Sequence, residues 1–210
     1  MSWTKVNIII ILFFILHLVG GVALSMDSVK SIFLTLTPFN LALTFGLLIW
    51  GNDDFSFKFF KIISVLFLIG FFVEILGVYS GLLFGEYHYG KTLGFQFLGV
   101  PLIIGVNWVL LVVSSFAVSS YFMSNSILKV LLSSIFMVLL DLMIEPVAIR
   151  LDFWHWQSEV IPLQNYLMWF LVSLLMNWIL TFNRFNFNVK LGFGLLISQV
   201  VFFTLQSFNF

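Results

Sequence analysis

The chain has 210 residues, of which 61% are hydrophobic and 9% charged, and its formal net charge is zero. This composition excludes a soluble globular protein, because a soluble domain of this size needs more polar side chains to cover its surface. The balanced charge argues against nucleic acid as a partner. The absence of cysteine excludes disulfides, thiolate catalysis and iron–sulfur clusters. The expected solvent is therefore the lipid bilayer.

Seven apolar stretches follow one another along the chain, each about 20 residues long. They lack the strict alternation of barrel strands, and a helix pairs its backbone groups internally within lipid, so we expect helices. In chain order, the membrane-spanning helices are expected at 6–24, 32–50, 59–83, 98–122, 127–149, 164–182 and 189–208. The predicted fold class is all-α: a polytopic membrane protein with residues 1–210 in one transmembrane domain and no strands.

Basic residues predict the orientation of the chain in the membrane. An N-terminus in the cytoplasm leaves three basic residues outside (Lys30, Lys91 and Arg150) and six inside: Lys5, Lys58, Lys61, Lys129, Arg184 and Lys190. The expected location is the inner (plasma) membrane of a bacterium, because abundant Phe, Ile and Asn are typical of an AT-rich bacterial genome. In either orientation, the 84–97 and 150–163 connections are separated by two spans and share one face of the membrane.

These two connections also resemble each other in sequence. Glu74 is followed after twelve residues by the triplet Tyr87-His88-Tyr89, and Asp141 is followed after twelve residues by Trp154-His155-Trp156. Each triplet is followed by a proline with a tryptophan seven residues beyond it, namely Pro101 with Trp108 and Pro162 with Trp169. We therefore predict a parallel internal repeat, in which the third and fourth spans correspond to the fifth and sixth. Coincidence in a chain rich in Phe and Leu is the alternative.

Three acidic residues, Glu74, Asp141 and Glu145, lie inside predicted spans. A carboxylate in a span costs several kcal/mol and normally faces the interior of the helix bundle. Asp141 and Glu145 are four residues apart and share a helix face, where two carboxylates cannot easily both ionise. One of them is expected to hold a proton and to serve as a general acid. A structural hydrogen bond, or an ion pair with Arg150, is the alternative.

The two connections carry further polar and aromatic residues. If the connections meet, we expect their polar residues to form a cap over the buried acids: Glu86, His88, Lys91, Arg150, Asp152 and His155. A water-facing loop in contact with lipid headgroups is the alternative. Asn107 and Trp108 lie within the fourth span, where an inter-helix hydrogen bond is the alternative to a substrate contact. The aromatic members of the triplets can stabilise a carbocation through their ring faces or anchor the protein at the membrane interface: Tyr87, Tyr89, Trp154 and Trp156.

Several classes of membrane enzyme are excluded because the chain lacks the residues that would bind their metal ions. The three histidines are too few for a di-iron hydroxylase, and Asn52-Asp53-Asp54 is a single incomplete match to the paired aspartate motifs that bind magnesium diphosphate. No metal site is predicted. Buried acids and aromatic rings are sufficient to protonate an electron-rich alkene, which gives a tertiary carbocation that water or an internal alkene then captures.

Two stretches resemble a known family. Phe84-Gly85-Glu86-Tyr87-His88-Tyr89-Gly90, followed by Leu98-Gly99-Val100-Pro101 and Asn107-Trp108, is similar to the carotenoid biosynthesis membrane proteins that include bisanhydrobacterioruberin hydratase and γ-carotene hydratase. The stretch Asp141-Leu142-Met143-Ile144-Glu145-Pro146 with Trp154-His155-Trp156 resembles the same family. The resemblance implies addition of water to the terminal double bond of an acyclic carotenoid end group. It also implies a carotenoid substrate drawn from the bilayer and no cofactor.

We therefore expect a carotenoid hydratase acting on γ-carotene, lycopene or a related chain, with other carotenoid-pathway enzymes as candidate partners. The expected catalytic residues are Asp141, Glu145, Glu74, His88 and His155. The expected substrate-binding residues are Glu86, Tyr87, Tyr89, Asn107, Trp108, Arg150, Trp154 and Trp156. Two alternatives stay open: a lycopene cyclase-type enzyme, which uses the same protonation, and a small proton-coupled transporter, which intramembrane acids and helix repeats would also suit.

Overall fold

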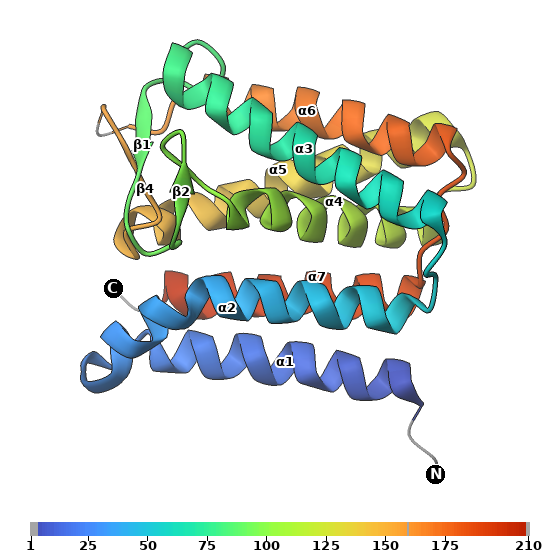
Figure 1. The fold of residues 1–210 in the computed structure, drawn as a ribbon, viewed down its shortest axis with the longest axis horizontal. Coiled ribbons are helices and arrows are strands. Elements are labelled where there is room, and N and C mark those ends of the chain that lie inside the picture. The colour runs from blue at the N-terminus through green and yellow to red at the C-terminus, as the bar shows by residue number, and fades with distance from the viewer. Residues whose placement is uncertain (1–3, 159, 209–210) are drawn as a thin grey trace.

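The computed structural model describes residues 4–158 and 160–208 (Figure 1). Within these residues, seven helices are long and apolar enough to cross a membrane, which confirms the predicted all-α, multi-pass membrane architecture. Their bounds are α1 Lys5–Ala23, α2 Asp27–Asn52, α3 Phe57–Ser80, α4 Ile103–Phe122, α5 Ser126–Arg150, α6 Leu163–Phe182 and α7 Val189–Ser207. Four of them begin behind a side chain that accepts a backbone N–H of the first turn: Thr4, Ser56, Asn125 and Asn188.

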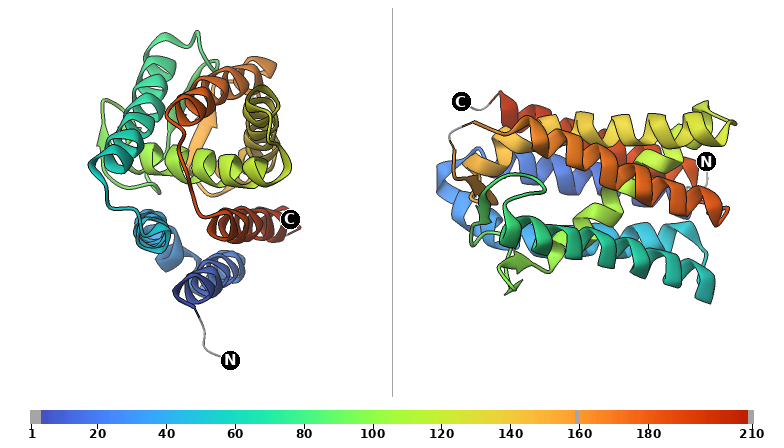
Figure 2. Two further views of the ribbon diagram at one scale, coloured as in Figure 1. Left: turned by 90° about the vertical axis from the view of Figure 1, so that its right-hand side faces the viewer. Right: turned by 90° about the horizontal axis from the view of Figure 1, so that it is seen from above.

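Helices α3, α4, α5 and α6 surround one core, and α7, α1 and α2 cover this bundle on the α4 side (Figure 2). α4 is the central helix, since it packs against α3, α5 and α7, with α2 also touching it. Every side chain from Trp108 to Ser119 is buried. A polar group beside α4 is therefore surrounded by protein rather than by lipid, which makes this helix the natural wall of an internal site.

The fourth span begins later than expected. We predicted a helix from 98, but α4 begins at Ile103, and the chain before it forms an antiparallel hairpin of β2 (Gln96–Phe97) and β3 (Val100–Pro101). Leu98 and Gly99 have φ values of 51° and 73°, a left-handed backbone that cannot continue a right-handed helix. The expectation of a chain without strands is therefore wrong within the connections.

A second strand pair joins the two connections that were predicted to share a face. β1 (Tyr87–Tyr89) and β4 (Trp154–Trp156) are antiparallel, with His88 opposite His155, and this ribbon closes one end of the α3–α6 bundle (Figure 1). Gly90 permits the close approach of the two connections, because a Cβ atom there would overlap the backbone oxygen and carboxylate of Asp152. The ribbon confirms that the two connections meet.

The internal repeat stays a prediction. Two features agree with it: the two aromatic triplets pair with each other, and Trp108 stacks on Trp169 with ring centroids 4.2 Å apart. One feature differs, because the first triplet donates hydrogen bonds to Glu74 whereas the second donates to Glu145. The residue at the corresponding sequence spacing is Asp141.

Candidate functional site

The ribbon presents different side chains on its two faces, because successive residues of a strand point to opposite sides. Tyr87, Tyr89, Trp154 and Trp156 point toward the helices, where their polar atoms reach carboxylates of α3 and α5. The two histidines lie between them in the strands, with ring centroids 5.5 Å apart, and His88 is exposed. The aromatic residues of the ribbon, and not its histidines, therefore face the predicted acids.

Glu74 on α3 is buried and accepts three hydrogen bonds. The hydroxyls of Tyr87 and Tyr89 donate to its Oε2 atom over 2.5 and 2.8 Å, and the indole Nε1 of Trp108 donates to Oε1 over 2.9 Å. Burial and the neighbouring Glu74 charge raise the pKa of both tyrosines well above the ordinary value of 10, so both remain O–H donors. Glu74 thereby connects α3, α4 and the ribbon.

Glu145 on α5 accepts the corresponding bonds from the other strand. The indole N–H groups of Trp154 and Trp156 donate to its Oε2 atom over 3.1 and 2.8 Å. The Nδ2 group of Asn165, near the start of α6, donates to Glu145 Oε1 over 3.0 Å and to Asp141 Oδ2 over 2.8 Å. A single amide group therefore bridges the two carboxyls of α5.

Asp141 is the least satisfied of the three acids. It is completely buried, and its Oδ1 atom has no hydrogen-bond partner among the described residues. The donors that reach Asp141 and Glu145 are neutral, namely two indoles and one amide. Two buried carboxylates held only by neutral donors repel each other, and a proton on one of them removes this repulsion.

A cavity of about 20 Å³ lies among the acids and the aromatic rings, which is room for one ordered water. This acid cavity is lined by Glu74, Phe84, Tyr87, Tyr89, Ile104, Asn107, Trp108, Glu145, Trp154, Trp156, Asn165 and Trp169. It combines carboxyl groups from two helices with a wall that is mostly aromatic. Such a site can deliver a proton to a bound group and stabilise positive charge against ring faces.

Comparison with protein-family models decides the family. Residues 39–206 match the model described as carotenoid biosynthesis protein. The chain belongs to this family. The match confirms the resemblance that the aromatic-histidine triplets suggested, and its range contains every residue that lines the acid cavity. Membership of the carotenoid biosynthesis family makes a carotenoid the expected class of substrate.

A curated relative is bisanhydrobacterioruberin hydratase of Haloarcula japonica, which is 30% identical over 112 residues. The aligned region covers 50% of this chain but 38% of the relative's length. No solved structure matches the chain. This carotenoid biosynthesis protein is therefore similar, over half of its own length, to a protein named as a hydratase.

Other predicted residues of this carotenoid biosynthesis protein lie outside the acid cavity. Arg150 donates to Gln206 Oε1 near the end of α7 over 2.7 Å, and Glu86 is exposed. His155 contacts Asp152 rather than a buried acid. Of the residues predicted to cap the acids, the two histidines therefore lie on the outer face of the ribbon, whereas the aromatic donors of the triplets lie on its inner face.

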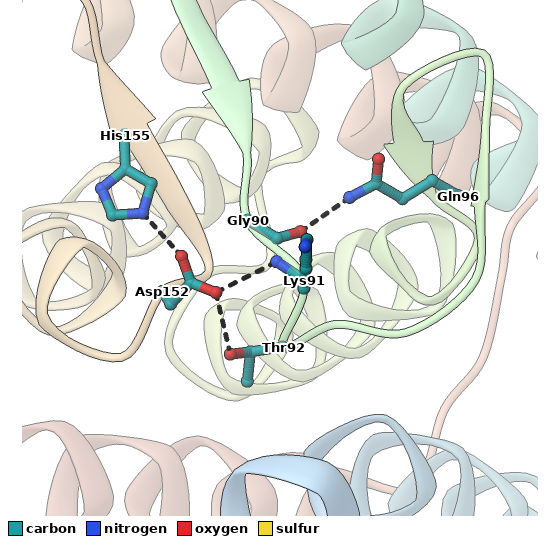
Figure 3. Close-up of polar contacts among 6 residues, drawn as sticks. All are labelled: Gly90, Lys91, Thr92, Gln96, Asp152 and His155. Carbon is teal, nitrogen blue, oxygen red and sulfur yellow. Dashed lines mark hydrogen bonds and ion pairs between the residues drawn. The ribbon is translucent and has the colours of Figure 1, made fainter.

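Asp152 stabilises the outer face of the ribbon (Figure 3). Its carboxylate accepts from His155 Nε2 over 2.8 Å, from the backbone N–H of Lys91 over 3.1 Å and from the Thr92 hydroxyl over 3.5 Å. The hydrogen bond from His155 is the main cause that lowers the pKa of Asp152 below its usual value. These contacts tie the end of one connection to the turn of the other and hold the two strands together.

Four residues of the acid cavity were not predicted as site residues, namely the apolar Phe84 and Ile104 together with Asn165 and Trp169. Asn165 bridges the two carboxyls of α5, and Trp169 stacks on Trp108. The sequence carries one weak signal for Asn165, an amide in an apolar span three residues after Pro162. Trp169 was noted only as part of the proposed repeat.

Proposed function

We propose that this protein is a carotenoid hydratase, which adds water to the terminal double bond of an acyclic carotenoid end group. The observation that carries the proposal is the pair of carboxyls Asp141 and Glu145, which one amide bridges and of which Glu145 lines an aromatic cavity. The family and the named relative support a carotenoid substrate and a hydration reaction. The apolar end group and a proton donor would meet at this cavity, and the surrounding side chains must move apart to admit the end group, because the cavity has room for one water.

In the proposed reaction, the carboxyl of Asp141 or Glu145 donates its proton to the less substituted carbon of the alkene. The alkene electrons form the new C–H bond and leave a tertiary carbocation, which the rings of Tyr87, Trp154 and other residues of the wall stabilise. Water then forms the C–O bond and returns a proton to the carboxylate, so the enzyme is regenerated. The second carboxyl takes the role of orienting the water, because the two histidines lie on the other face of the ribbon.

An apolar groove offers a place for the polyene chain. It has a volume of about 670 Å³ and runs between α2 and α3 over α4, and it is lined by Phe45, Gly46, Ile49, Trp50, Phe55, Phe60, Ile63, Ser64, Phe67, Leu68 and Val106. Val106 is the α4 residue that lines this groove, and its neighbour in the chain, Asn107, lines the acid cavity. A slender hydrocarbon could therefore lie between α2 and α3 with its end group close to the acids.

Product analysis tests the reaction. Expression in cells that make lycopene or γ-carotene should give a carotenoid heavier than its precursor by one water, identified by chromatography and mass spectrometry. A new product of unchanged mass would indicate a cyclase instead, since internal capture of the cation adds no atoms. No new product, together with proton-coupled flux across vesicles, would indicate a transporter and would contradict the proposal.

A bulky residue at Gly46 should block the substrate groove. A Cβ atom at this position meets nothing within 4 Å, so Gly46→Phe should fold normally while its ring occupies the groove. We expect the yield of hydrated carotenoid to fall about tenfold, because a misplaced end group loses its alignment with the acids. Gly46→Ala should remain close to wild type, and Ile32→Phe on the exposed surface of the same helix is the matched control. Equal yields from all variants would remove the groove from the proposal.

A further inference from the structure

A second cavity adjoins the acid cavity on the side of α1, α2 and α7. Its volume is about 70 Å³, which is room for several waters. Its polar lining includes Thr37 and Asn107, and three further polar side chains from three different helices: His17 of α1, Asn40 of α2 and Gln199 of α7. Apolar residues form most of the remaining wall, and the proposed proton transfer uses none of these three polar groups.

The polar groups of this second cavity are short of hydrogen-bond donors. Gln199 is 4% exposed, and its Oε1 atom has no partner among the described residues. The Oδ1 atom of Asn40 is also buried and also has no hydrogen-bond partner among the described residues. His17 has Nδ1 2.8 Å from the backbone oxygen of Phe13, so Nδ1 carries the hydrogen in the neutral ring and Nε2 presents a lone pair. Buried acceptors of this kind require a donor, and the smallest donor is water.

The two cavities share a wall. Ile104, Asn107 and Trp154 line both of them. Trp154 lines the second cavity, and its indole N–H donates a hydrogen bond to Glu145, which lines the acid cavity. Asn107 contributes an amide at the junction. A water molecule in the second cavity is therefore separated from the acid cavity by three side chains.

We propose that the second cavity is a water site that supplies the nucleophile to the acid cavity. This inference rests on the proposed hydration and deepens it. The acid cavity has room for one water, and an end group that enters it would displace that water into the neighbouring space. A carbocation without a nearby nucleophile loses a proton and returns to an alkene. A water reservoir beside the cavity would instead let the cation be captured as the alcohol.

The test compares water capture with proton transfer in the same reaction. Membranes containing the full chain are incubated with lycopene in D₂O, and the products are separated into alcohol and deuterium-exchanged alkene. Both products require protonation, whereas only the alcohol requires captured water. In Gln199→Leu and Asn40→Leu, we expect total deuterium uptake to stay near wild type while the ratio of alcohol to exchanged alkene falls at least about fivefold.

Folding and controls are measured alongside. Removal of an unpaired buried acceptor should leave thermal stability in detergent unchanged or raised, so a shift in product ratio is not explained by unfolding. Ser198→Ala is the matched control, because Ser198 is a buried neighbour on α7 whose hydroxyl is satisfied by Gly194 of its own helix. A wild-type product ratio in both leucine variants overturns the water site. It is also overturned if these variants differ from wild type only in how strongly an added tertiary alcohol inhibits them, because the cavity would then bind a hydroxylated carotenoid. Absence of deuterium uptake in every chain would instead overturn the proposed hydration.

Discussion

Replacement of Asp141 by asparagine should abolish the hydrated carotenoid while the protein keeps its abundance and stability. The expected loss of activity is about 10²–10⁴-fold, the usual contribution of a positioned general acid. Folding should survive because Asp141 Oδ1 is unpartnered among the described residues. An amide can place its NH₂ group at this position and still offer an oxygen to Asn165, which donates to the other carboxyl oxygen. The product yield in a lycopene-producing host is the measurement.

Glu145→Gln should also lose activity, but for two combined reasons. Both oxygens of Glu145 already accept from N–H groups of Trp154, Trp156 and Asn165. An NH₂ group at either oxygen therefore meets another donor, and the contact with the ribbon is disturbed as well as the proton lost. The exposed Asp27→Asn variant is the control for both changes. If Asp141→Asn and Glu145→Gln both hydrate carotenoid at the wild-type rate, the proposed acids are not the proton donors.

Glu74→Leu should destabilise the protein by about 3–5 kcal/mol, because three buried donors lose their acceptor and each unsatisfied donor costs about 1–3 kcal/mol. The leucine would leave the Tyr87 and Tyr89 hydroxyls and the Trp108 indole N–H without their acceptor. The midpoint of thermal unfolding in detergent, followed by tryptophan fluorescence, should fall by roughly 10 °C. Protease sensitivity of the ribbon should increase, because its first strand loses its contact with α3.

Glu74→Gln distinguishes this structural role from a catalytic one. The glutamine keeps one accepting oxygen, and the phenol hydroxyls can rotate to accept from its NH₂ group. We expect a smaller loss of stability than in Glu74→Leu and a measurable hydratase activity. Glu86 is exposed in the connection that carries Tyr87 and Tyr89, so Glu86→Leu is the control and should unfold near the wild-type temperature. An unchanged unfolding temperature in Glu74→Leu would show that the three donors find other acceptors.

Some features of the site could be predicted without a structure because they depend on simple rules. Hydrophobic length predicts the spans, and the number of spans between two connections decides which connections share a face. The cost of charge in a membrane places Glu74, Asp141 and Glu145 inside the bundle, where they are found. The grouping of acids and aromatic residues could therefore be expected from the chain alone.

Other features depend on contacts between distant residues. The pairing of β1 with β4 joins His88 to His155, which are 67 positions apart in the chain, and local propensity carries no signal for such a pairing. Without that pairing, the alternation of inward aromatic and outward histidine side chains cannot be assigned, so the histidines were expected beside the acids. The role of Asn165 was missed for the same reason, since an amide in a span does not reveal which carboxyls it will meet.

By itself, the sequence determined that this protein has several membrane-crossing helices and buries the three acids within them, Glu74, Asp141 and Glu145, because lipid cannot solvate a charge as water does. The tertiary structure decided which donor meets which carboxyl, which face of the ribbon looks inward, and which acceptors remain unpaired beside α4. These choices depend on distances of about 3 Å between residues far apart in the chain, and such distances exist only once the helices have packed.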